Sequence, residues 1–143
     1  MIWSKVKQRF EAMLAPALRG RVQVHLTSYE RTSRFDVGRG WITLDGVEVV
    51  SVQVPSFYSN NIGFDTRTLD FGKALYSYPD LAIEAALASE DALISGLAFM
   101  DGRCGKRRLL ATDAQALHKF AHILYELRCT TEGLVRKAAP PAA

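Results

Sequence analysis

Apolar residues recur every three or four positions near the start of the chain and alternate with polar residues soon afterwards. Across residues 3–14 the apolar side chains form one stripe, because 3.6 residues complete a helical turn. The members of this stripe are Trp3, Val6, Phe10 and Met13. We predict a helix that is capped by Ser4 and runs to about Leu14 or Leu18. Gly20 then ends the helix.

Two segments with a period of two follow this helix. Residues 21–30, "RVQVHLTSYE", alternate apolar and polar side chains, which is typical of a half-buried strand. Residues 40–54, "GWITLDGVEVVSVQV", contain two β-branched runs on either side of Asp45 and Gly46. This pair favours a two-residue hairpin turn, because both residues tolerate positive φ. The pattern predicts an antiparallel sheet of three consecutive strands.

The predicted hairpin has apolar residues on both faces. One face carries Ile42, Leu44, Val47 and Val49, with Leu44 opposite Val47 and Ile42 opposite Val49, and the other carries Trp41, Val50 and Val52. Either helices cover both faces or one face is a docking surface, since monomers rarely leave a contiguous apolar area uncovered. Trp41 and the nearby Arg39 are the predicted anchors of such a surface, because interface energy concentrates on aromatic and arginine side chains.

Helical periodicity dominates the rest of the chain. Helices are predicted near residues 67–77, 80–88, 90–100 and 113–128, with Thr66, Ser89 and either Thr112 or Asp113 as caps. The fold class is therefore α+β: an N-terminal helix, a three-stranded antiparallel β-meander, and an all-helical C-terminal half packed on the sheet. We predict a single domain over residues 1–136 and a flexible tail over residues 137–143.

The composition is that of an ordinary globular protein. The chain has 143 residues, of which 48% are hydrophobic and 23% charged, and its net charge of +3 is too small to indicate a nucleic-acid ligand by itself. The cysteines Cys104 and Cys129 are typical of a reducing compartment. The start lacks the features of a signal peptide, and no apolar run approaches the roughly 20 residues that span a bilayer. We therefore expect a cytoplasmic protein that does not contact a membrane.

The most basic stretch is "DGRCGKRRL", residues 101–109. It is not a phosphate-binding P-loop, because Met100 stands where the first glycine would be and Arg107 replaces the hydroxyl residue after Lys106. Two interpretations remain open. The cations Arg103, Lys106, Arg107 and Arg108 form a contact site for phosphates or an acidic partner, or they are a solvated turn between two helices.

The sequence contains no recognisable catalytic or cofactor motif. His118 and His122 are one helical turn apart, but the glutamate of a zinc HExxH motif is missing between them, which favours histidines at the edge of the core. A nucleophile elbow of the G-x-S-x-G type is also missing. We assign no catalytic, metal or cofactor-binding residue, and we expect no cofactor.

Four stretches carry a resemblance: "WSKVK", "GRVQVHLTSY", "GRGWITLDGVEV" and "GKRRL". Together they resemble a family of small uncharacterised bacterial proteins with no known activity. The resemblance implies a stand-alone bacterial domain, and it transfers no site residue.

Three functions are consistent with these features. The first is a non-enzymatic protein-binding module of a bacterial cytoplasm, for example an immunity-like protein that neutralises a toxin or other antagonist. Its candidate partner-binding residues are Arg39, Trp41, Arg103, Lys106, Arg107 and Arg108. The alternatives are a nucleic-acid-binding protein that uses residues 103–108, and an enzyme of unrecognised type. The sequence does not indicate an oligomeric state.

Overall fold

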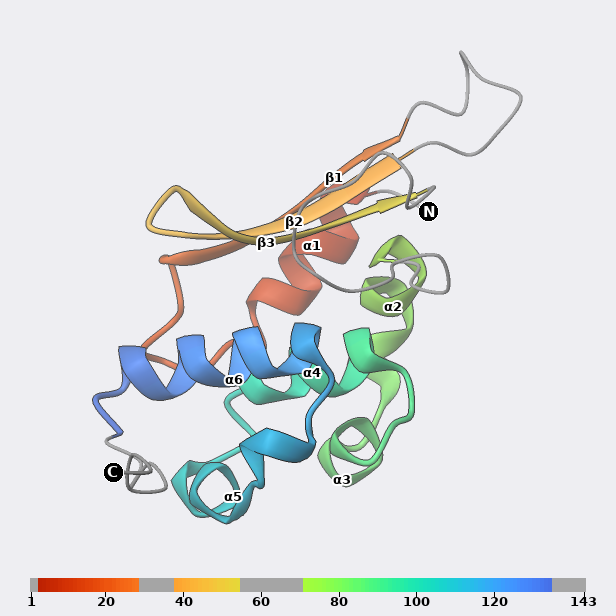
Figure 1. The fold of residues 1–143 in the computed structure, drawn as a ribbon. Coiled ribbons are helices and arrows are strands. Elements are labelled where there is room, and N and C mark those ends of the chain that lie inside the picture. The colour runs from red at the N-terminus through yellow and green to blue at the C-terminus, as the bar shows by residue number, and fades with distance from the viewer. Residues whose placement is uncertain (1–2, 29–37, 55–70, 135–143) are drawn as a thin grey trace.

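A three-stranded sheet lies on one side of the molecule and the helices lie on the other (Figure 1). The computed structural model describes residues 3–28, 38–54 and 71–134. The strands are β1 (Val22–Ser28), β2 (Gly38–Leu44) and β3 (Val47–Val54), antiparallel and in the order β1-β2-β3. The predicted α+β class and the meander are therefore confirmed.

The helices form the rest of the fold. They are α1 (Trp3–Glu11), α2 (Phe71–Ser77), α3 (Ile83–Leu87), α4 (Ala92–Met100), α5 (Lys106–Ala111) and α6 (Lys119–Thr131), with short 3-10 helices η2 (Tyr78–Asp80) and η3 (Ala114–Ala116). In Figure 1, α1, α2, α4 and α6 lie between the sheet and the outermost helices α3 and α5. The apolar core fills the space between the sheet and this inner layer.

α1 is shorter than predicted. It begins at Trp3, so that Ser4 lies inside the helix and is not its cap, and it ends at Glu11. Pro16 excludes the longer predicted helix, to Leu18, because proline removes a backbone donor and disfavours helical geometry at the residue before it. The freed backbone bonds to the end of α4 instead: the N–H of Ala15 donates to the carbonyl of Met100 at 2.9 Å.

Two side chains of α1 cover the free edge of β1. The N–H of Val24 donates to Glu11 Oε2 at 2.9 Å, and Lys7 Nζ donates to the carbonyl of Val24 at 2.8 Å. Lys7 and Glu11 also pair with each other at 2.7 Å. The Lys7–Glu11 pair thus occupies the backbone N–H and carbonyl to which a further strand would bond. This protects the exposed edge of the sheet from unwanted strand pairing.

The hairpin turn is the predicted one. Asp45 and Gly46 both have positive φ, of 52° and 82°, as a two-residue turn of the I′ type requires. Leu44 pairs with Val47, also as predicted. At the outer side of the turn, Arg21 donates two hydrogen bonds to the Asp45 carboxylate, of 3.0 and 2.7 Å.

The register further along the hairpin differs from the prediction. Ile42 pairs with Val50 rather than Val49, because a β-bulge next to Ile42 adds one residue to β3. One extra residue moves every later side chain of that strand to the other face. Val50 and Val52 therefore lie in the core with Ile42, and the prediction that they share a face with Trp41 is wrong.

Two predicted helix starts are also corrected. Asp91, not Ser89, caps α4: its carboxylate accepts from the N–H of Leu93 at 2.9 Å. The predicted helix 113–128 is divided, since Asp113 caps η3 and α6 begins only at Lys119. Thr66 and residues 137–143 lie outside the described residues.

Candidate functional site

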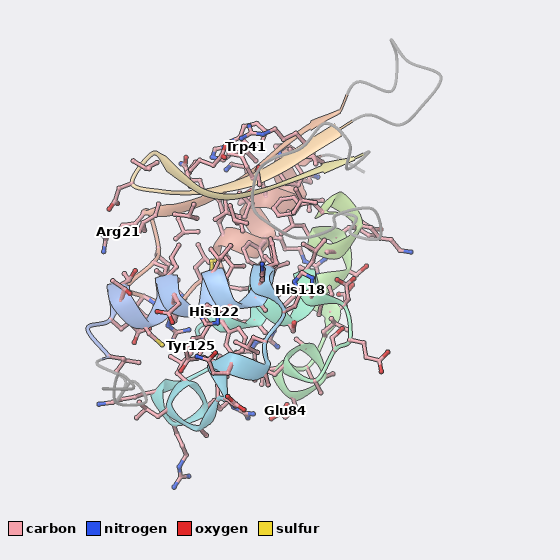
Figure 2. All side chains as sticks on the ribbon, viewed as in Figure 1. Arg21, Trp41, Glu84, His118, His122 and Tyr125 are labelled. Atoms are coloured by element: carbon pink, nitrogen blue, oxygen red, sulfur yellow. The ribbon has the colours of Figure 1, made fainter. Side chains whose placement is uncertain are left out.

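Trp41 lies on the face of the sheet that points away from the helices (Figure 2). Its partner across the strands is His25, and the two rings are stacked with their centroids 5.0 Å apart and their planes 20° apart. Arg39, two residues earlier on β2, places its guanidinium carbon 4.3 Å from the centre of the Trp41 ring. The partly exposed indole of Trp41 therefore contacts both an imidazole and a guanidinium.

Polar contacts fix both partners of the indole. His25 Nε2 lies 3.1 Å from Thr43 Oγ1 on the neighbouring strand. Arg39 forms an ion pair with Glu48 of β3. We call these five residues, His25, Arg39, Trp41, Thr43 and Glu48, the outer-face cluster. The cluster spans all three strands, and no described helix covers it (Figure 1).

The charges around His25 favour its neutral form. Partial burial lowers the pKa of its imidazole, and the cations Lys7 and Arg39 lower it further, while the nearby Glu11 carboxylate raises it. Lys7 and Glu11 are the α1 pair that covers the edge of β1. At neutral pH, Arg39 is therefore the cation that faces the Trp41 indole.

The bulge separates Trp41 from the apolar residues that sequence reasoning placed beside it. Its surroundings are polar, not aliphatic, because Ser51 and not Val50 is the residue opposite Trp41 on β3. A signal of this exists in the sequence. Glu48 and Ser51 are three residues apart, whereas strict alternation would separate outward-facing polar residues by two or four.

The basic stretch is divided between two roles, and its first part is structural. Arg103 donates from Nη2 to the Asp101 carboxylate at 2.8 Å and from Nη1 to the carbonyl of Leu81 at 2.9 Å. The Asp101 carboxylate also accepts from the hydroxyl of Tyr78 at 2.7 Å. Burial and this hydrogen bond raise the pKa of Tyr78. Arg103, a candidate partner-binding residue, thus holds the loop after α4 in place.

The second part of the stretch forms α5. Arg108 pairs with Glu84 of α3 at 2.9 Å, which joins the two outermost helices. Lys106 and Arg107 are exposed, and within the described ranges we find no partner for either. α5 and the sheet lie at opposite ends of the molecule (Figure 1). The structure therefore does not bring Arg39 and Trp41 together with the basic candidates.

A buried arginine that sequence reasoning missed stabilises the same region. Arg128 of α6 is only 3% exposed and donates to the carbonyls of Phe99, Asp101 and Cys104, at 2.8, 3.0 and 2.8 Å. It also forms an ion pair with Glu132. A helix end leaves carbonyls without partners, and Arg128 satisfies those after α4. The sequence pattern gives little sign of this role, because an apolar residue before Arg128 is equally compatible with an exposed arginine.

The two histidines of the C-terminal part have structural contacts. His118 is the N-cap of α6, where its Nδ1 accepts from the N–H of Phe120 at 3.0 Å. His122 bonds through Nδ1 to the carbonyl of Ala114 at 3.0 Å and lies 3.3 Å from Glu126. Among the described residues, no group of three histidine, cysteine or acidic side chains is placed to hold a metal ion.

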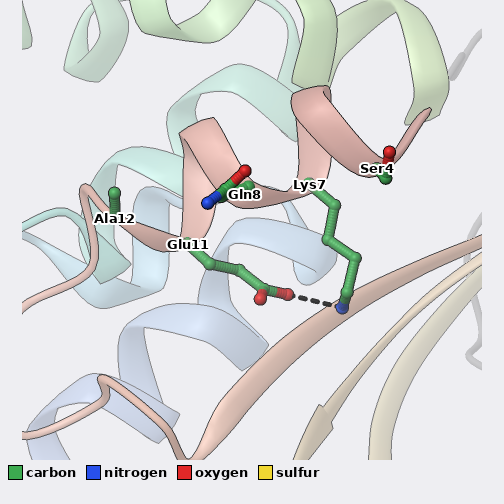
Figure 3. A pocket seen from close by; sticks show the side chains of 5 residues that line it. All are labelled: Ser4, Lys7, Gln8, Glu11 and Ala12. Carbon is green, nitrogen blue, oxygen red and sulfur yellow. Dashed lines mark hydrogen bonds and ion pairs between the residues drawn. The ribbon is translucent and has the colours of Figure 1, made fainter. Parts of the chain in front are cut away.

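A hollow of about 450 Å³ runs along α1 (Figure 3). Its lining consists of Ser4, Lys7, Gln8 and Glu11 of α1 and of Ala12, the residue after this helix. Its charged groups, Lys7 and Glu11, are already bonded to each other and to β1. The hollow therefore has no converging polar groups of the kind that a small-molecule site requires.

The comparison with known proteins covers most of the chain. Residues 2–68 and 64–129 match the model of the SF0329 protein family. The chain belongs to this family. No curated protein and no solved structure matches it. The expectation of an uncharacterised family is thereby confirmed for this SF0329-family chain, whereas the four stretches as family motifs and the bacterial origin stay predictions. In the part of this chain that the structure describes, no helix is long and apolar enough to cross a bilayer.

Proposed function

We propose that this SF0329-family protein is a non-enzymatic binding module that docks a protein partner on the outer face of its sheet. The observation that carries the proposal is the stack of Arg39 and His25 against Trp41 on a face without a described covering helix. Tryptophan and arginine are the residues in which interface energy concentrates. An immunity-like role in a bacterial cytoplasm is the narrower form of this proposal.

The organisation of the outer-face cluster supports docking over a purely structural role. Trp41 and Arg39 are ordered by neighbours on β1 and β3 before any partner arrives. Pre-ordered side chains lose less conformational entropy on binding than free ones do. The core residues lie on the opposite face of the sheet, so that the Trp41 side chain can change without opening a cavity in the core.

The basic residues support the nucleic-acid alternative less well. Arg103 and Arg108 bond to acidic side chains of the protein itself. Of the four cations predicted to act together, the described structure leaves Lys106 and Arg107 for a ligand. Two phosphate contacts give a salt dependence of only about −1.8 in log K against log salt, far below that of established DNA-binding proteins.

The test compares Trp41→Ala with the matched control Tyr76→Ala, which truncates an exposed aromatic of α2. Proteins that co-purify with the full chain from its native cells are quantified for wild type and both variants, and the strongest is purified for titration calorimetry. We expect Trp41→Ala to weaken binding at least about 30-fold, which corresponds to about 2 kcal/mol, and Tyr76→Ala to leave it unchanged. Equal affinity of wild type and Trp41→Ala for that purified partner would overturn the proposal.

A further inference from the structure

A neutral imidazole and a charged guanidinium share the Trp41 indole. The His25 ring lies 5.0 Å from the indole, and the Arg39 guanidinium lies 4.3 Å from it. An aromatic face attracts cations, and an imidazolium is a cation as well. Protonation of His25 would therefore place two positive charges against the same ring.

The charged groups around His25 determine which cation moves. From α1, Lys7 and Glu11 face it, and Lys7 is held by Glu11 and by the backbone of Val24. From β2, Arg39 faces it, and Arg39 has a second partner in Glu48 of β3. Among the described charged groups near His25, Arg39 is therefore the cation that can leave the indole and still keep an acidic partner.

We propose that His25 is a proton-controlled switch of the outer-face cluster: the protonated imidazole keeps its place on the Trp41 indole, and Arg39 withdraws from the indole while it keeps its ion pair with Glu48. The proton enters on the ring nitrogen of His25 that carries none in the neutral form. Repulsion between two cations at one ring drives Arg39 away from the indole, and the existing ion pair with Glu48 holds the displaced guanidinium. The role of this switch in partner binding rests on the proposed function, because it changes how Arg39 is presented on the docking face.

The switch can be tested on the full chain alone by NMR. We would follow the His25 Cε1–H, the Trp41 indole N–H and the Arg39 Nε–H from about pH 7.5 to about pH 4.5, a range that covers histidine titration. All three signals are expected to shift with one common midpoint, below the value of about 6.5 for an unperturbed histidine. Arg39→Gln is expected to raise the His25 midpoint, because it removes a neighbouring cation.

The matched control is Arg21→Gln, which removes the same charge at the hairpin turn, where Arg21 pairs with Asp45. This variant should leave the His25 midpoint close to that of wild type. Glu48→Gln is a second test that does not alter Arg39: it removes the carboxylate that pairs with the arginine and should lower the His25 midpoint. If Arg39→Gln fails to fold, the His25 midpoint in Glu48→Gln tests the switch in its place.

Two results would overturn the switch. One is that the Trp41 and Arg39 signals stay constant while His25 titrates. The other is that Arg39→Gln shifts the His25 midpoint no more than Arg21→Gln does. These measurements need no partner, so that their failure leaves the docking proposal intact. Conversely, a partner that binds Trp41→Ala as tightly as wild type would refute docking and leave the titration result standing.

Discussion

The hydroxyl of Tyr78 donates a 2.7 Å hydrogen bond to the carboxylate of Asp101. Tyr78 is fully buried and Asp101 is 1% exposed. Asp101 follows α4, and its carboxylate also accepts from the backbone N–H and the guanidinium of Arg103. This one bond therefore connects η2 to the loop in which the most basic stretch of the chain begins.

Removing the Tyr78 hydroxyl should destabilise the fold. Tyr78→Phe keeps the ring that packs edge-on against Phe10 but leaves the buried Asp101 carboxylate with one donor fewer. Hydrogen bonds to charged groups contribute about 1.5–3 kcal/mol, and we expect a loss of that size in the free energy of unfolding measured by urea denaturation. Tyr76→Phe, which alters an exposed tyrosine, is the control and should change nothing. A Tyr78→Phe variant as stable as wild type would show that water replaces the hydroxyl.

The hairpin turn should depend on its left-handed residues. Gly46 has a φ of 82°, which a β-branched side chain resists. Gly46→Val is therefore expected to lower the free energy of unfolding by about 1 kcal/mol or more. Gly46→Asn should cost less, because asparagine tolerates this conformation. Equal losses in thermal or urea denaturation for both variants would contradict the role of positive φ.

Neutralising the exposed cations of α5 tests the nucleic-acid alternative. Because Arg103 and Arg108 bond to Asp101 and Glu84, we expect wild type to show no appreciable affinity for duplex DNA or RNA at physiological salt. The double change Lys106→Gln with Arg107→Gln should then have no effect in fluorescence anisotropy. Tight binding by wild type, with a salt slope that falls by about 1.8 in the double variant, would instead favour a nucleic-acid-binding protein.

His25 should make stability depend on pH. Burial and nearby cations lower its pKa in the folded protein, so that the unfolded chain takes up the proton first as pH falls. The His25 contribution is zero above about pH 7, and stability is lost from the unfolded pKa of about 6.5 down through the folded pKa. Denaturation of wild type and His25→Gln at several pH values measures this loss by difference. We expect wild type to lose more stability on acidification, and parallel curves would show that the pKa of His25 is the same in both states.

Local patterns in the sequence determined the elements of the sheet. Positive φ at Asp45 and Gly46 follows from the two residues themselves, and alternation of side chains identified β1. The last long helix was also predictable, because the buried residues of α6 recur with a helical period, whereas α4 is apolar almost all round and shows no such period. These features arise from interactions between residues close together in the chain, which is why the sequence alone sufficed.

Only the tertiary structure decided what the polar residues do. The bulge that gives Trp41 its polar surroundings shows in the sequence only as the three-residue spacing of Glu48 and Ser51, and no turn residue specifies it. Arg103 could be an exposed cation or a structural one until Asp101 and Leu81 came to lie beside it. Arg128 likewise acquires its role from carbonyls 24 to 29 residues away in the chain. The electrostatic energy of a charged side chain depends mainly on the groups within a few ångströms of it. For these residues folding supplies those groups from distant parts of the chain, so the local sequence does not predict them.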